Sequence, residues 1–155
     1  MVIIPKPIAG LSKPALARFI TRARRATGLS GTVNVLVTSN AEMKALNRRF
    51  RGTDKATDVL SFPAAPDDNK NFAGDIAISA EIATQNARSL NHAPGVEVKI
   101  LTLHGILHLC GYDHERDRGQ MARREQKLRR ELHLPVGLIE RIAPDHTLQQ
   151  KRRRP

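Results

Sequence analysis

The sequence predicts an α+β fold, in which a small mixed β-sheet is packed by helices, one of them central and apolar. Its 155 residues suit a single domain, because a chain of this length buries enough surface to fold without disulfides. Segments rich in β-branched residues alternate with segments in which apolar residues recur at helical spacing. Residues 96–110 are apolar on nearly every side, which is typical of a helix at the centre of a fold.

The first half of the chain contains two predicted helices and two predicted strands. Ser12 can cap the first helix and Gly28 can end it, because a serine hydroxyl accepts from free N–H groups and glycine adopts left-handed backbone easily. Asn40 can cap a second, shorter helix that runs to Phe50. The two strands, rich in β-branched residues, are predicted at residues 32–38 and 59–62.

The second half contains one more strand and three helices. Residues 63–72 are predicted to form a turn-like, mobile connection, and residues 74–79 a strand. Ser79 can cap a helix that runs to about residue 91, and Gly111 can end the apolar helix over residues 96–110. The last helix is predicted over residues 117–132, with Met121, Leu128 and Leu132 inward and Arg123, Lys127 and Arg130 outward.

Charge gives the first indication of a partner. The chain carries 26 Lys and Arg against 15 Asp and Glu, a net charge of +11, and residues 116–155 hold 12 basic and 5 acidic side chains. This excess favours a polyanionic partner, with a solvated basic surface as the alternative. Aromatic residues make up only 3% of the chain, so we expect phosphate contacts rather than base stacking to dominate. We expect one domain over residues 1–146 and a flexible basic tail over residues 147–155.

Composition also bears on the cellular compartment. The longest apolar stretch, residues 100–110, contains two histidines and is too short to span a bilayer. The N-terminus lacks the pattern of a secretory signal, and the single Cys110 fits a reducing environment. We therefore expect a cytoplasmic protein without a membrane partner.

The most informative motif contains three histidines. His104 and His108 are four residues apart, so on a helix they lie on one face, one turn apart. Gly111 can break the helix, which lets the chain fold back and bring His114 to the same place. Three neutral imidazoles and an open fourth position are typical of a catalytic zinc site.

Two other interpretations of these histidines remain open. A structural zinc site would need a fourth protein ligand, for which Asp113 and Cys110 are the candidates. Cys110 lies about 200° around the helix from His108, which favours a place in the core instead. The three histidines could also be unrelated, although burying imidazoles without partners in an apolar helix is costly.

The spacing of the histidines and Gly111 equals that of metzincin proteases, H-E-x-x-H-x-x-G-x-x-H. In those proteases the glutamate after the first histidine is the general base, and here that position is Gly105. Glycine cannot accept a proton, so peptide hydrolysis is disfavoured. Gly105 could let a substrate approach the metal, or it could allow close helix packing.

The motif H-G-x-L-H-L-x-G-Y-D-H, from His104 to His114, resembles that of the YbeY family of bacterial endoribonucleases. The segment 46–63 is similar to that family's L-N-x-x-Y-R-x-x-D-x-P-T-D-V-L-S-F-P, and the Gly-Asp-Ile at residues 74–76 to its G-D-I strand. Phe50 stands where the family usually has tyrosine, and Ala56 where it has proline.

The resemblance implies a zincin-like α+β fold with one Zn²⁺ per chain, held by His104, His108 and His114. It also implies cleavage of single-stranded RNA, in maturation of the 3′ end of 16S rRNA and in ribosome quality control, with the small subunit and its assembly factors as partners. Arg51, which matches the family's motif arginine, would be a catalytic residue that contacts phosphate near the metal.

The sequence leaves parts of the mechanism open. Asp58, Asp75 and Asp113 are candidates for a general base, and either water or the RNA 2′-OH could attack the phosphate. Two other functions also remain open: a zinc hydrolase of another substrate, such as a peptide or a small phosphodiester, and a ribosome-assembly factor with structural zinc and no catalysis.

Overall fold

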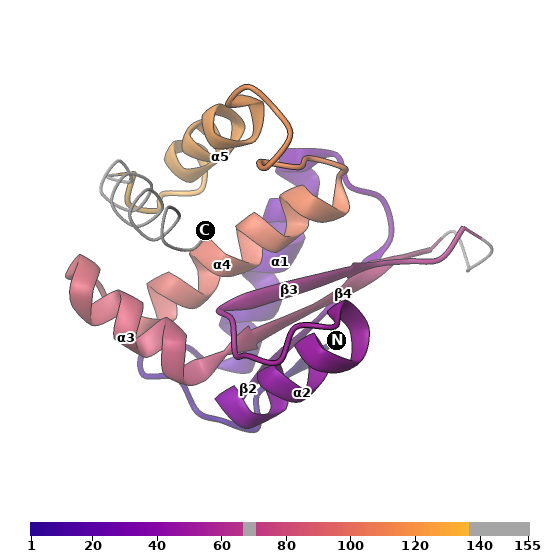
Figure 1. Ribbon diagram of the computed structural model, residues 1–155. Helices are drawn as coiled ribbons and strands as arrows, with labels where there is room; N and C mark the ends of the chain where they lie inside the picture. Colours follow the sequence, from indigo (N-terminus) through magenta and orange to yellow (C-terminus); the bar gives the residue numbers. More distant parts are fainter. Residues whose placement is uncertain (67–70, 137–155) are drawn as a thin grey trace.

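The computed structural model describes residues 1–66 and 71–136, and within these ranges five helices pack on a mixed four-stranded sheet (Figure 1). The predicted α+β class is therefore confirmed. The strand order is β1-β2-β4-β3, with β3 antiparallel to β4 and the other neighbouring strands parallel. The strands are β1 (Val2–Ile3), β2 (Thr32–Thr38), β3 (Val59–Pro63) and β4 (Phe72–Ser79). The helices are α1 (Lys13–Thr27), α2 (Asn40–Arg51), α3 (Ala80–Leu90), α4 (Pro94–Leu109) and α5 (Gln120–Glu131).

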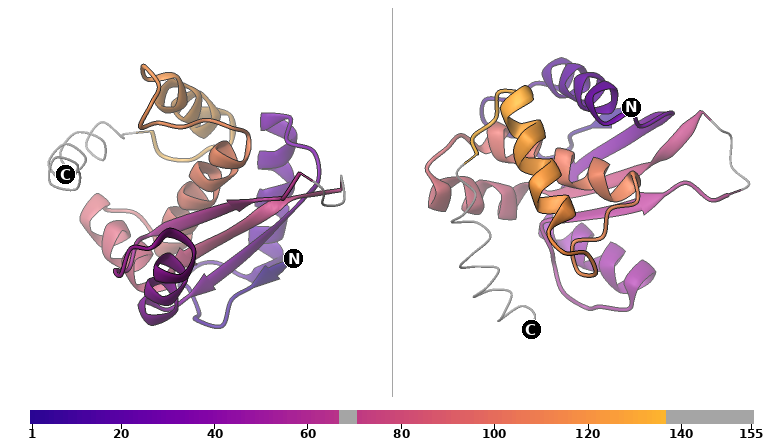
Figure 2. Two further views of the ribbon diagram at one scale, coloured as in Figure 1. Left: turned by 45° about the vertical axis from the view of Figure 1, so that its right-hand side comes forward. Right: turned by 90° about the horizontal axis from the view of Figure 1, so that it is seen from above.

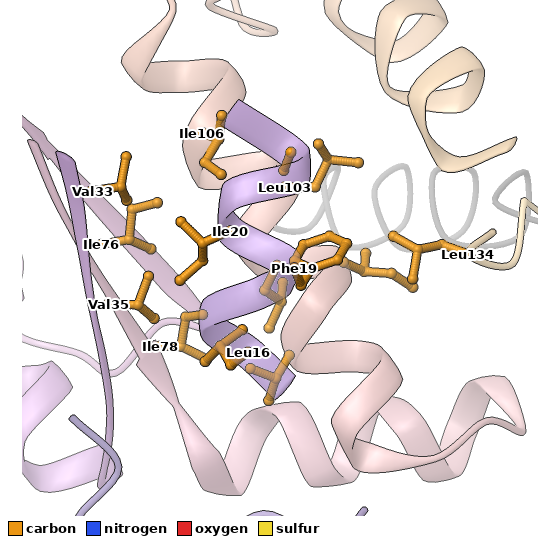
Figure 3. Close-up of a cluster of buried hydrophobic side chains, with 14 of the residues drawn as sticks. Leu16, Phe19, Ile20, Val33, Val35, Ile76, Ile78, Leu103, Ile106 and Leu134 are labelled. Atoms are coloured by element: carbon orange, nitrogen blue, oxygen red, sulfur yellow. The ribbon is translucent and has the colours of Figure 1, made fainter. Parts of the chain in front are cut away.

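Helices cover both faces of the sheet. Helices α1 and α4 lie on one face and α2 lies on the other, as two further views show (Figure 2). Because side chains alternate along a strand, one set of strand residues faces each layer. A smaller cluster on the α2 side joins Met43, Leu60 and Ala77. The main core, shown in Figure 3, includes Leu16, Phe19 and Ile20 of α1, Val33 and Val35 of β2, Ile76 and Ile78 of β4, and Leu103 and Ile106 of α4.

Among the described helices, α4 contributes the most buried residues to this core. Ten of its 16 residues are buried, and it contacts β3, β4, α1, α3 and α5. Gly105 allows its close approach to the sheet, because a Cβ added there would lie 2.9 Å from Cδ1 of Ile76. Of the two explanations for Gly105, the structure supports close helix packing.

Helix α2 is capped by a different residue from the one predicted. The Ser39 hydroxyl accepts from the N–H of Glu42 at 3.2 Å, and serine and glutamate three residues apart match the sequence pattern of a capping box. Asn40, the predicted cap, instead accepts a hydrogen bond from the Ser79 hydroxyl at 2.6 Å. Both residue types can cap a helix, and the tertiary contact with Ser79 decides between them.

Other differences from the prediction concern where elements begin. Helix α4 starts at Pro94 and β4 at Phe72, two residues earlier than expected in each case. Helix α5 starts at Gln120, because the carboxylate of Asp117 accepts from the N–H groups of Gly119, just before the helix, and Met121, in its first turn. The two-residue strand β1 was not predicted. The predicted domain limit at residue 146, the tail over residues 147–155 and the middle of the predicted turn, residues 67–70, lie outside the described residues.

In the part of the chain that the structure describes, no helix is long and apolar enough to cross a membrane.

Candidate metal centre

The three predicted histidines meet at the C-terminal end of α4. His104 and His108 lie one turn apart on that helix, and the chain then reverses at Gly111, whose φ of +100° favours glycine. The reversal brings His114 to the other two. One nitrogen from each imidazole lies within 4.8 Å of the others, so the group could hold a metal ion.

Hydrogen bonds fix the orientation of two of these rings. Nδ1 of His104 lies 3.0 Å from a carboxylate oxygen of Glu125, and Nδ1 of His108 lies 3.0 Å from the backbone carbonyl of Tyr112. Both partners are acceptors, so each Nδ1 carries the proton and each Nε2 presents a lone pair. The two Nε2 atoms lie 3.3 Å apart. Two lone pairs that face each other repel, and a cation bound between them removes this repulsion. The arrangement of the imidazole nitrogens therefore fits a metal ion.

Electrostatics favour the neutral imidazoles that metal binding requires. Burial, followed by the nearby His104 and His114, lowers the pKa of His108 to about 4. Burial, followed by His104, also lowers the pKa of His114. Both rings are therefore neutral at pH 7, and a metal ion need displace few protons from them.

Glu125 and Arg129 of α5 support the site, and neither was singled out from the sequence. Arg129 is 2% exposed, and its Nε donates to a carboxylate oxygen of Glu125 at 3.1 Å. A second nitrogen of Arg129 donates to the carbonyl of Pro135 at 3.1 Å. Burial alone would raise the pKa of the Glu125 carboxyl, but His104 and Arg129 outweigh it and hold that pKa at about 2. The carboxylate beside His104 is therefore ionised and fixed in place.

A signal for Glu125 existed in the sequence. It lies four residues after Met121 and three before Leu128, and both of these residues are buried. The i, i+4, i+7 spacing places all three on the inner face of α5. A carboxylate on the apolar face of a helix indicates a buried partner.

Arg51 lies beside the histidine cluster, across one strand. Its guanidinium donates to the carbonyl of Ser61 on β3 at 2.6 Å, and the Ser61 hydroxyl donates to the carbonyl of Gly105 at 3.2 Å. Gly105 lies between His104 and His108 on α4. Arg51 itself is exposed, at the C-terminal end of α2.

The candidate carboxylates and the cysteine remain outside the cluster. Asp75 accepts from Asn34 at 3.0 Å, and Asp113 pairs with Arg116 at 3.5 Å. Burial raises the pKa of the Cys110 thiol, which packs beside the core. Over residues 1–66 and 71–136, the group that could hold a metal ion contains three histidines and neither of the proposed fourth ligands, Asp113 and Cys110.

The chain is similar to a known protein family along most of its length. The sequence model of the family described as Endoribonuclease YbeY matches residues 7–133. A protein of Koribacter versatilis named Endoribonuclease YbeY is 53% identical over 154 residues, which cover 99% of each chain. A protein of Solibacter usitatus with the same name is 46% identical over 134 residues, covering 86% of this chain and 88% of the relative.

A solved structure is also similar. The solution structure of a Thermotoga maritima protein superposes with a TM-score of 0.56 at 32% identity, covering 85% of this chain and 89% of that one. The family model and the full-length relative match both the segment that contains Arg51 and the segment that contains the three histidines. The chain therefore belongs to the YbeY family of endoribonucleases.

Proposed function

We propose that this protein is a zinc-dependent endoribonuclease that cleaves single-stranded RNA. Its cellular role would be maturation of the 3′ end of 16S rRNA and ribosome quality control in the cytoplasm, in contact with the small subunit and its assembly factors. The observation that carries the proposal is the convergence of three imidazole nitrogens within 4.8 Å of one another in a member of an endoribonuclease family.

Zinc suits this donor set better than other common ions. Imidazole nitrogen is a preferred zinc ligand, whereas Mg²⁺ and Ca²⁺ favour oxygen. We propose His104, His108 and His114 as the ligands of one zinc ion per chain. Three protein ligands leave a coordination position for water or substrate, as catalytic zinc sites require. Zinc bound there would activate water and withdraw charge from a phosphoryl oxygen.

The surrounding residues would orient the ligands and the substrate. Glu125 accepts the Nδ1 proton of His104, which holds the tautomer whose Nε2 is free to bind metal. Arg51 is the proposed catalytic residue, because a guanidinium can contact two phosphate oxygens at once. One of its nitrogens is held by Ser61, which leaves further N–H groups for a phosphate.

The charge of the chain supports an RNA substrate. The net charge is +11, and the end of α2 presents Arg48, Arg49 and Arg51 to solvent beside β3. Phosphate contacts of this kind make affinity fall steeply with salt.

The decisive experiment combines metal analysis with parallel cleavage assays. We expect one zinc per chain, with three histidine ligands and a solvent molecule in its coordination shell. We expect the zinc-loaded protein to cleave single-stranded RNA, to spare duplex RNA and casein, and to lose activity with a chelator. Cleavage of casein or of small phosphodiesters alone would indicate another hydrolase. A fourth protein ligand together with no cleavage would indicate a structural zinc in a binding protein.

Product analysis then selects the nucleophile. A 2′,3′-cyclic phosphate at the new end would show attack by the RNA 2′-OH. A 5′-phosphate on the downstream fragment would show attack by water. Substrates with a 2′-deoxy nucleotide at the cleavage site test the same point, because only the first route requires that hydroxyl.

A further inference from the structure

Phe50 is an unusual surface residue. Its side chain is 56% exposed, and the other exposed large apolar residues among those described, Met1 and Ile3, lie at the N-terminus. Phe50 extends from the C-terminal end of α2, and its ring contacts the half-buried ring of Phe62 edge to face, with centroids 5.3 Å apart. A large aromatic side chain left in water next to another indicates a surface that binds something apolar and flat.

Cationic side chains flank both rings. The guanidinium carbon of Arg49 lies 5.2 Å from the centroid of Phe50, and that of Arg51 lies 5.7 Å from the centroid of Phe62. Such cation–π contacts place positive charge over one face of each ring. The patch therefore combines π surface with positive charge, which is the combination that single-stranded nucleic acid recognises.

The aromatic pair lies across one strand from the histidines. Ser61 and Phe62 are neighbours on β3, an edge strand of the sheet, and neighbouring residues point to opposite faces. Ser61 faces α4, where its hydroxyl bonds to Gly105, and Phe62 packs with the cluster on the α2 side. Figure 1 shows β3 along the sheet edge, with α2 below it and α4 above it. The hydrogen bonds from Arg51 to Ser61 and from Ser61 to Gly105 therefore connect this edge to the helix that carries His104 and His108.

We propose that Phe50 and Phe62 form a stacking subsite for a nucleobase of single-stranded RNA, one whose backbone continues over β3 toward the three histidines. Arg49 and Arg51 would contact the phosphates on either side of that base. The inference rests on the proposed RNA-cleaving function and adds a base contact to it. It also revises the expectation that phosphate contacts rather than base stacking dominate the binding, because two of the few aromatic residues lie together at one place on the surface.

The test measures RNA binding without cleavage. The full-length protein is titrated, with a chelator present, against a short single-stranded RNA and against an abasic RNA of equal length. We expect Phe50→Ala to weaken binding of the normal RNA by about 5- to 150-fold, the range for loss of one stacked base. Binding of the abasic RNA should be unchanged, because it offers only phosphate and sugar. Phe50→Trp should retain affinity for the normal RNA.

Two further variants separate stacking from simple apolar contact. Phe50→Leu keeps apolar bulk without a π face, and we expect it to bind as weakly as Phe50→Ala. Ile3→Ala removes another exposed apolar side chain, from the far edge of the sheet, and its affinity should match that of the unaltered protein. A 2-aminopurine in the RNA gives a direct readout, because its fluorescence is quenched on stacking and should recover in Phe50→Ala. Thermal unfolding of each variant verifies the fold.

The outcomes also separate this inference from the proposed function. If the unaltered protein cleaves RNA and Phe50→Ala binds normal RNA equally well, the stacking subsite is wrong and the nuclease proposal stands. The stacking subsite is also wrong if Phe50→Ala weakens binding of normal and abasic RNA alike. If the unaltered, zinc-loaded protein neither binds nor cleaves RNA, the proposed function itself fails.

Discussion

The histidine cluster on α4 and the aromatic end of α2 lie on either side of β3 but are built in opposite ways. In the first, the rings of His104 and His108 are held by hydrogen bonds, and the carboxylate that holds His104 is itself held by the buried Arg129. In the second, Phe50 and Arg51 extend into solvent from the last turn of their helix. A metal needs ligands placed before it arrives, whereas a flexible RNA strand can adapt to exposed side chains. Substitutions in the first region should therefore weaken metal binding. Substitutions in the second region should weaken RNA binding and leave metal binding unchanged.

The largest effect is expected for His108→Ala. Loss of one of three ligands should abolish zinc binding at micromolar zinc, and with it all RNA cleavage, because two imidazoles hold zinc weakly. Metal content after dialysis and a cleavage assay measure the two effects. His133→Asn is the matched control, since His133 is exposed, lies outside the cluster and has a positive φ that asparagine tolerates. Full activity of His108→Ala in metal-free buffer would falsify the zinc assignment.

A charge reversal at Arg51 should give the second largest effect and separate the two regions. We expect Arg51→Glu to reduce RNA cleavage by about 100-fold, comparable to losing one donor to transition-state charge. Zinc content should be unchanged, because Arg51 is held by Ser61 and not by a histidine. Arg18→Glu, an equal reversal at an exposed position of α1, is the control. An unchanged cleavage rate in Arg51→Glu would contradict the proposed contact between Arg51 and a phosphate of the RNA.

A smaller loss of zinc affinity is expected when a residue that holds one of the histidines is altered but the three histidines remain. Glu125→Gln keeps the shape of the side chain but removes the charge beside His104, and we expect zinc affinity to fall by about 10- to 100-fold. Competition with a chromophoric chelator measures this affinity. Glu131→Gln, an exposed position on the same helix, is the control. Equal zinc affinity in Glu125→Gln and the unaltered protein would show that Glu125 has no role in holding the ligand.

The same contrast explains which features the sequence could predict. The histidine cluster depends on local geometry, namely a four-residue helical spacing and one glycine that reverses the chain, so its residues could be named from the sequence. The relation of Arg51 to Gly105 through Ser61 depends on the pairing of β3 with β4 and the packing of α4 against them. No local pattern encodes a contact between segments more than 40 residues apart.

Helix α5 shows an intermediate case. The inward positions Met121, Leu128 and Leu132 follow from helical spacing, and all three are buried. Arg129 is also buried, although arginine is among the least often buried residues. Its burial depends on a buried carboxylate partner and on the carbonyl of Pro135, which only the folded chain brings together.

The smallest expected effect is a difference in acid sensitivity. The pKa of His108 is about 4 in the folded, metal-free protein, against an ordinary value of 6.5 for the unfolded chain. Between these values the unfolded chain binds more protons than the folded one, so protons favour unfolding. The stabilising contribution of neutral His108 is complete above pH 6.5 and is lost as the pH falls toward 4. Below about pH 4.5, protonation of Glu125, whose folded pKa is about 2, adds to the loss.

Urea unfolding of the metal-free protein at a series of pH values between 4 and 7 measures this effect. We expect the free energy of unfolding to decrease as the pH falls from 6.5 to 4, and the decrease to be shallower in His108→Asn, which does not titrate in this range. In Phe50→Ala the free energy of unfolding should change with pH as it does in the unaltered protein, because this substitution removes no titrating group. If His108→Asn and the unaltered protein show the same slope, the histidine cluster is open to solvent. The contrast between a half-buried histidine cluster and an exposed aromatic end of α2 would then be wrong.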